Sequence, residues 1–203
     1  MDDVATQLGQ IDIYLFDQLQ RGGLPRGSRV LEAGCGGGRN LQYLLAAGYP
    51  VFGVDADANA IETLRRMARQ LAPSLPAENF RVEPVEALSF PDHDVHAVLS
   101  IAVLHFARDD AHFEAQLRSM WRVLRPGGLF FCRLASSIGM ESQMKPLGGR
   151  RSLLPDGSER YLVDAPMLLE WTRKLGGTLL DPIKTTVVHE SRSMTTWVVR
   201  KTL

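Results

Sequence analysis

The chain has 203 residues, of which 45% are hydrophobic and 23% charged, as in an ordinary folded domain and unlike a disordered segment. Lys plus Arg and Asp plus Glu each number 23, so the formal net charge is zero. This balance argues against nucleic acid as the main partner, because proteins that neutralise phosphates usually carry a basic surplus.

Short β-rich runs alternate with longer helical runs over the first two thirds of the chain. An amphipathic stretch at residues 10–22 comes first. The patterns then predict strands at 29–33, 51–54, 80–85, 95–100 and 129–134, and helices at 40–47, 58–71 and 109–124. This alternation implies a mostly parallel sheet with helices on both faces.

The last third of the chain has a different pattern. Residues 136–161 are rich in Gly, Ser, Arg and Met with weak periodicity, which predicts a long loop or cap. A helix at 165–175 and alternating runs at 178–188 and 194–200 follow, and the two runs predict an antiparallel hairpin. We expect a single α/β domain over 1–203, doubly wound and Rossmann-like, with a seven-stranded sheet and an N-terminal lid helix within 1–24.

Cysteine content and the N-terminal residues bear on the compartment. Cys35 and Cys132 are too few for a disulfide framework or a four-ligand zinc site, so we expect a reducing compartment and no metal. The first ten residues open with Asp2 and Asp3 and lack the features of a signal peptide. No apolar stretch reaches the roughly 18 residues of a membrane span. We expect a cytoplasmic protein.

The strongest local signal is the run EAGCGGG at 32–38, between a predicted strand and a predicted helix. Gly34, Gly36 and Gly38 carry no Cβ, so a ligand can lie against the backbone of this turn. Open sheets of this kind bind ligands beyond the carboxyl ends of their strands. The alternative is a tight glycine turn without a ligand.

The glycine spacing separates two classes of ligand. A dinucleotide fingerprint, G-x-G-x-x-G, would need glycine at position 39, where the chain has Arg39. The acidic Glu32 also precedes the turn, and its carboxylate would repel a pyrophosphate but attract a cationic amino-acid group. The pattern therefore favours a ligand that carries an amino acid over a nicotinamide dinucleotide.

Asp55 ends the second predicted strand, about twenty residues after the glycine turn. A carboxylate there can accept hydrogen bonds from both hydroxyls of a ribose. Asp55 would alternatively cap the following helix, but Asp57 is the better candidate for the N-cap.

Together these residues resemble the class I S-adenosylmethionine-dependent methyltransferases. The resemblance covers 29–134, and its motifs occur in the family's order: EAGCGGG, VFGVDAD, PVEALSFPDHDVHAVLS and LRPGG. It implies S-adenosylmethionine as cofactor and S-adenosylhomocysteine as product. Glu86 stands where the family commonly has a shorter Asp. The implied cofactor residues are Glu32, Gly34, Cys35 and Gly36 at the amino-acid part, Asp55 at the ribose, Ala56 and Glu86 at the adenine, and Ser100 and Ile101 beside the sulfonium.

Four basic residues are candidates for the acceptor site. His105 follows the fourth strand and would orient or deprotonate an acceptor, or else hydrogen-bond the backbone at a helix start. Arg39 would face the site or the solvent. His189 and Arg192 lie in the C-terminal hairpin, where the chain is loosely similar to tellurite and thiol-type methyltransferases, or they belong to an exposed turn.

The expected acceptor is a small molecule, because residues 136–161 are too few for a folded recognition domain. An RNA or protein methyltransferase is the alternative, although Ser100-Ile101-Ala102-Val103 stands where base-modifying enzymes often have an Asp/Asn-Pro-Pro-Tyr run. A non-catalytic S-adenosylmethionine-binding module is a third hypothesis. The expected oligomeric state is a monomer or a homodimer.

Overall fold

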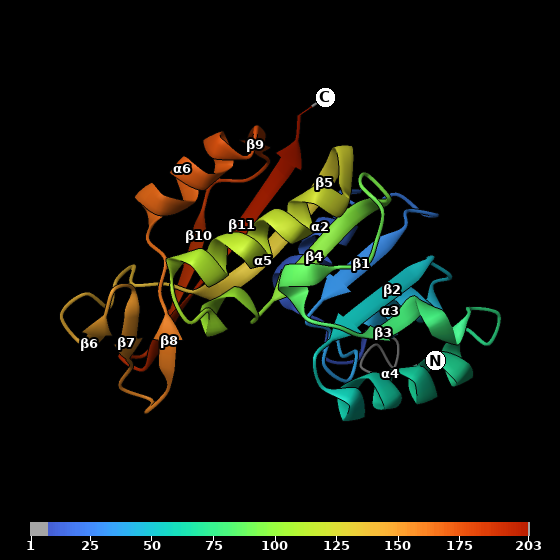
Figure 1. Ribbon diagram of the computed structural model, residues 1–203, viewed down its shortest axis with the longest axis horizontal. Coiled ribbons are helices and arrows are strands. Elements are labelled where there is room, and N and C mark those ends of the chain that lie inside the picture. The colour runs from blue at the N-terminus through green and yellow to red at the C-terminus, as the bar shows by residue number, and fades with distance from the viewer. Residues whose placement is uncertain (1–7, 203) are drawn as a thin grey trace.

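The computed structural model describes residues 8–202, and its largest feature is one twisted sheet (Figure 1). The strand order is β10-β11-β5-β4-β1-β2-β3, and β9 also pairs with β11, which makes eight strands in the described chain. The bounds are β1 (Val30–Ala33), β2 (Val51–Asp55), β3 (Phe80–Val82), β4 (Val95–Ile101), β5 (Leu124–Ala135), β9 (Gly177–Leu179), β10 (Lys184–Val188) and β11 (Arg192–Lys201).

Strand direction divides this sheet into two parts. β1 pairs in parallel with β2 and β4, and the parallel pairing continues to β3 and β5. β11 runs antiparallel to β5, β10 and β9. The predicted α/β class, a doubly wound and mostly parallel sheet ending in an antiparallel hairpin, is therefore confirmed, with β9 as a short addition.

Helices bury both faces of the sheet. α5 (Asp110–Val123) and α6 (Ala165–Lys174) cover one face, and α2 (Ile13–Gln20), α3 (Leu41–Ala46) and α4 (Ala58–Leu71) cover the other. Neighbouring strand residues point to opposite faces, so Phe130 packs with the first group and Phe131 with the second. Asp57 caps α4 by accepting a hydrogen bond from the Asn59 N–H at 2.8 Å, as its sequence position predicted.

Three of the predicted elements differ from those observed. The third strand ends at Val82 instead of residue 85, because Pro84 has no N–H for the ladder and a 3₁₀ turn, η2 (Val85–Ala87), follows. The run 178–188 is two strands, β9 and β10, interrupted at Pro182. The fifth strand begins at Leu124, with an irregularity in its pairing before Leu129.

The segment 136–161 was expected to be a loop or cap and is a small antiparallel sheet. Its strands are β6 (Lys145–Gly148), β7 (Arg151–Leu153) and β8 (Glu159–Tyr161). Tyr161 fastens it to the main domain by stacking on Phe113, with 5.0 Å between ring centroids, and by donating a hydrogen bond to Asp110 at 2.7 Å.

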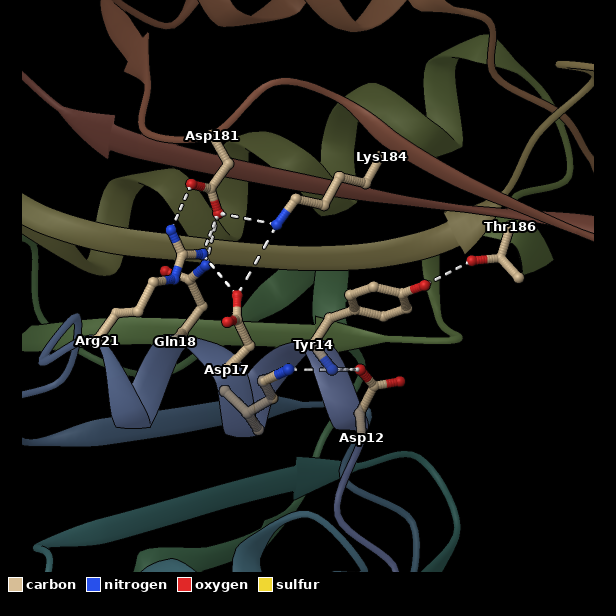
Figure 2. Close-up of polar contacts among 9 residues, drawn as sticks. Asp12, Tyr14, Asp17, Gln18, Arg21, Asp181, Lys184 and Thr186 are labelled. Carbon is tan, nitrogen blue, oxygen red and sulfur yellow. Dashed lines mark hydrogen bonds and ion pairs between the residues drawn. The ribbon is translucent and has the colours of Figure 1, made fainter.

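The N-terminal helix α2 is attached to the C-terminal hairpin (Figure 2). The Tyr14 hydroxyl lies 2.7 Å from the hydroxyl of Thr186. Both Gln18 and Arg21 donate hydrogen bonds to Asp181, at 2.6 to 2.8 Å. The predicted lid region 1–24 thus contains a helix held by specific contacts, and its residues 1–7 lie outside the described chain. No helix within 8–202 has the length and apolar character that crossing a membrane would require.

Candidate active site

The candidate site lies where the sheet order reverses. β2 lies on one side of β1 and β4 on the other, so the carboxyl ends of these strands border a crevice, the place where open α/β sheets bind ligands. Three adjoining cavities occupy it. We call them the turn cavity, along Glu32 and the glycine turn, of about 500 Å³; the Asp55 cavity, of about 370 Å³; and the arginine cavity, beside His105, of about 380 Å³.

Ala102, which follows β4, lines all three cavities. Its φ of 62° lies in the left-handed region, which is uncommon for a residue with a Cβ. The Ala102 N–H donates to the Arg133 carbonyl at 2.8 Å and holds this conformation. Strained backbone of this kind is often retained at functional sites, and here it marks the point where the cavities meet.

The glycine turn after β1 has left-handed backbone at two of its glycines. Gly34 has a φ of 75° and Gly36 a φ of 52°. A Cβ on Gly34 would lie 2.4 Å from the side chain of Val103, so no larger residue fits there. A Cβ on Gly36 would meet no atom within 4 Å, so the turn borders open space at that point. Both glycines line the turn cavity, together with Cys35.

Glu32 is the acidic group of the turn cavity and is 1% exposed. The Asn40 amide donates to its Oε1 at 2.6 Å, while its buried Oε2 accepts no hydrogen bond from the described chain. Burial raises the pKa of Glu32 to about 8, and the Asn40 hydrogen bond and the charge of Arg39 oppose this only in part. An unpartnered buried carboxylate oxygen fits a cationic ligand group such as an ammonium.

Asp55 connects the glycine turn to the Asp55 cavity. It accepts hydrogen bonds from the Gly36 N–H at 2.8 Å and from the Asp57 N–H at 2.9 Å. Each oxygen of an ionised carboxylate has two acceptor positions, so both retain capacity for ribose hydroxyls. Ala56, the next residue, lines the same cavity.

The far end of the Asp55 cavity contains polar groups suited to a heteroaromatic base. Glu86 lines it from η2, and its Oε1 lies 3.3 Å from Nε2 of His112. Gln116 of α5 is 6% exposed, and its buried Oε1 accepts no hydrogen bond from residues 8–202. A hydrogen-bond acceptor in this position can pair with the exocyclic amino group of such a base.

Ser100 and Ile101 were both predicted to lie beside the sulfonium, but their surroundings differ. Ile101 lines both the turn cavity and the arginine cavity. Ser100 is 0% exposed and lies among the strands, so the expectation that it borders the cofactor channel is corrected. Successive residues of a strand point to opposite faces, so Ser100 points away from the face of Ile101, while Ala102, beyond the end of β4, lines the cavities.

His105, in the 3₁₀ turn η3 (Leu104–Phe106), lines the arginine cavity and is 5% exposed. Its Nδ1 accepts a hydrogen bond from the Ala135 N–H at 3.1 Å, so the neutral ring carries its proton on Nε2. Burial lowers the pKa of His105 to about 4, and the charge of Arg160 lowers it further. The ring is therefore a neutral hydrogen-bond donor at pH 7 and not a base.

The four residues predicted for the acceptor site do not all come together. Arg39 and Arg192 line the arginine cavity with His105. His189 is exposed in the turn between β10 and β11, with a φ of 31°, and lines none of the three cavities. Its proposed contact with an acceptor is corrected on this ground, since the hairpin turn places it beyond the cavity.

Several cavity residues were not found from the sequence. Gln116 is a polar residue on the apolar stripe of α5, a local signal that would have identified it. Asn40 was placed at a helix start but makes no capping hydrogen bond; it joins Glu32 to the Asp12 backbone N–H, at 3.0 Å. Arg133 and Arg160 have no local signal, because distant parts of the fold bring them to the cavity.

Comparisons with known proteins identify the family and the fold. The family model described as "Methyltransferase domain" matches residues 31–132. A ubiquinone biosynthesis O-methyltransferase of Methylocella silvestris is 35% identical over 131 residues, covering 58% of this chain and 49% of that protein. A fatty-acid O-methyltransferase of Mycolicibacterium smegmatis is 29% identical over 165 residues, covering 80% and 52%.

A solved structure extends the comparison over the whole chain. The 1,6-didemethyltoxoflavin-N1-methyltransferase of Burkholderia thailandensis, with S-adenosylhomocysteine bound, superposes with a TM-score of 0.70 at 21% identity. It covers 100% of this chain and 80% of that one. This likeness shows the fold.

The strand order and the crevice at its reversal define a Rossmann-like α/β fold. The chain belongs to the methyltransferase domain family, whose model matches half of it. It spans about half the length of the two O-methyltransferases described above.

Proposed function

We propose that this protein transfers the methyl group of S-adenosylmethionine to a small-molecule acceptor. One observation carries the proposal: two cavities suited to the two ends of the cofactor and a third cavity meet at Ala102. A cofactor lying across the glycine turn would have its sulfur near that junction. An acceptor in the arginine cavity would then face the methyl group.

The turn cavity would hold the amino-acid part of the cofactor. Glu32 Oε2 is the proposed partner of its ammonium group, and this contact would give that buried oxygen the donor it lacks in the described chain. Gly34, Cys35 and Gly36 would lie against the chain of the ligand, where the turn leaves open space. Ile101 would lie beside the sulfonium.

The Asp55 cavity would hold the adenosine. Asp55 would accept hydrogen bonds from both ribose hydroxyls, and Ala56 would pack against the adenine. Glu86 and Gln116 are the candidates to accept from the adenine amino group, since both carry carbonyl-type oxygens in this cavity. The longer side chain of Glu86, compared with the family's usual Asp, is consistent with its place in η2.

Bound S-adenosylmethionine supplies the methyl carbon: the acceptor's lone pair forms the new bond to it, and the electron pair of the carbon–sulfur bond leaves with the sulfur. The protein's task is to align the acceptor and exclude water, and proximity of this kind contributes about 7–11 kcal/mol. His105 would orient the acceptor by donating from Nε2. An acceptor that loses a proton would release it to solvent.

The arginine cavity and the elements around it bear on the size of the acceptor. A cavity of about 380 Å³ is the size of ordinary small-molecule sites, which favours a small acceptor over RNA or a protein segment. The sheet β6–β8 is the proposed cap over it, and α2 the proposed lid. We also propose a cytoplasmic protein that is a monomer or a homodimer.

Isothermal titration of the protein with S-adenosylhomocysteine, S-adenosylmethionine and a reduced nicotinamide dinucleotide tests the cofactor. The first two should bind and the third should not. Turnover of methyl-labelled S-adenosylmethionine with small phenols, thiols, amines and carboxylates tests the reaction. Binding of the nicotinamide alone would refute the assignment. Binding without transfer to any of these classes would favour a non-catalytic module.

A further inference from the structure

The arginine cavity is unusually basic for a protein with zero net charge. Four guanidinium groups line it, from four different elements of the fold: Arg39, Arg133, Arg160 and Arg192. Among its described lining residues, Asp156 is the one carboxylate. Guanidinium groups stay protonated at any pH at which the protein is folded, so the cavity carries a permanent excess of positive charge.

Most of this charge is not neutralised within the described chain. Arg133 is paired with Asp12, with 2.8 Å between Nη1 and Oδ2. Arg39 and Arg192 form no hydrogen bond or ion pair with residues 8–202, and Arg160 donates to the Glu159 carbonyl. Several arginines elsewhere do have a carboxylate partner, among them Arg21, Arg29, Arg122, Arg150 and Arg151.

Asp156 offsets one of these charges. Its burial would raise its pKa, but hydrogen bonds from Ser158 and the charges of Arg192 and Arg160 lower it, so it is ionised. Three arginines without a paired carboxylate and one aspartate leave an excess of two positive charges in a concave site. Like charges gathered in one cavity repel one another, and an anion bound among them would relieve this repulsion.

The remaining wall of the cavity is apolar. Leu154, Val188 and Met194 line it together with Ile101 and Ala135. Arg160 also lies over the ring of Phe106, 4.8 Å from its centroid. A free inorganic anion would leave this apolar surface uncovered, whereas an organic anion would cover it.

We propose that the acceptor is a small organic carboxylate, anchored by Arg160 and Arg192 with its apolar body against Leu154 and Met194. This inference rests on the proposed function. Both arginines line the arginine cavity and neither of the cofactor cavities, so the anchored carboxylate lies away from the junction at Ala102. It takes no part in the bond changes, and another atom of the acceptor receives the methyl group.

Calorimetric titration of the protein saturated with S-adenosylhomocysteine tests this inference. The probes are hexanoate, benzoate and 3-phenylpropionate, each compared with its uncharged amide, and inorganic phosphate. We expect at least one carboxylate to bind about tenfold or more tightly than its amide, and its affinity to fall as sodium chloride is raised. Phosphate should bind more weakly, because it has no apolar body.

Three variants locate the anchor. Arg160→Gln and Arg192→Gln should each weaken carboxylate binding about tenfold, and Arg192→Lys less, because the ammonium retains charge but not the planar fork. Arg173→Gln, on an exposed arginine of α6 that lines none of these cavities, is the matched control and should change nothing. The dissociation constant of S-adenosylhomocysteine should be the same in all of them.

The inference would be overturned if every carboxylate bound no better than its amide, or if Arg160→Gln and Arg192→Gln both bound like the parent protein. Phosphate binding more tightly than all three carboxylates would replace it with an inorganic anion site. These outcomes leave the cofactor assignment intact. Failure of S-adenosylhomocysteine itself to bind would instead refute the proposed function, and this inference with it.

Discussion

Glu32→Gln isolates the energetic consequence of burying an unpartnered carboxyl group. In the unfolded chain Glu32 has its ordinary pKa of 4.5, and burial raises it to about 8 in the folded protein. Each tenfold change in proton affinity is worth about 1.4 kcal/mol. The ionised form is therefore destabilised in the fold by about 5 kcal/mol relative to the protonated form.

This difference makes stability depend on pH with a definite sign. Between pH 4.5 and 8 the folded protein keeps a proton that the unfolded chain has released. The contribution of Glu32 is fully present below pH 4.5 and is lost as the pH rises through 8. From pH 5 to pH 9 the parent protein should lose about 4 kcal/mol of unfolding free energy through this group. The neutral glutamine of Glu32→Gln loses none.

Urea unfolding of both proteins at intervals from pH 5 to pH 9 measures the effect. The difference between their unfolding free energies should change by about 4 kcal/mol across this range. Parallel curves would show that the Glu32 pKa is close to its ordinary value.

Ligand binding gives a second measurement of the same group. The affinity for S-adenosylhomocysteine should rise with pH more steeply in the parent than in Glu32→Gln, because the ligand's ammonium pairs with the ionised carboxylate.

Four further predictions follow from particular contacts. Asp55→Ala should weaken S-adenosylmethionine binding by about 1.5–3 kcal/mol through lost hydrogen bonds, and an unchanged dissociation constant by calorimetry would remove Asp55 from the site. Gly34→Ala should lower unfolding free energy by about 2–4 kcal/mol in urea, through its φ and its steric clash. Gly27→Ala, with positive φ but no close neighbour, should cost about 1–2 kcal/mol; equal losses would exclude the clash. The NMR signals of His105 should not titrate between pH 5.5 and 8, because its pKa is about 4, and a midpoint near 6.5 would contradict its burial. Asp181→Asn should cost about 1–3 kcal/mol by loosening the contacts of α2, and should speed proteolysis near that helix; unchanged values would show that these contacts do not hold it.

The glycine turn and its contact with Asp55 were largely predictable from the sequence, because they are built from residues near one another in the chain. Gly34, Gly36 and Asp55 follow two neighbouring strands, and parallel strands end at the same edge of the sheet. The hydrogen bond from the Gly36 N–H to Asp55 joins residues 19 positions apart. Ser100 was misplaced because one step along a strand reverses the direction of the side chain.

The acceptor half was less predictable. Arg133 is paired with Asp12, which lies 121 positions away in the sequence. Arg160 comes from β8, in a segment whose composition indicated a loop, because its short strands gain their stability from pairing and packing that no local pattern records. His105 was predicted to lie near the acceptor, and it lines the arginine cavity. Its tautomer and low pKa depend on the Ala135 N–H and on burial, which only the folded structure supplies.

By itself, the sequence determined the sheet and the place of the glycine turn beside Asp55, since periodic hydrophobic residues and a glycine turn act through local backbone geometry. Only the tertiary structure decided the charge of the arginine cavity, because that charge is a sum over residues from four distant elements. Electrostatic interactions depend on separation in space and on burial, and neither can be read from positions along the chain.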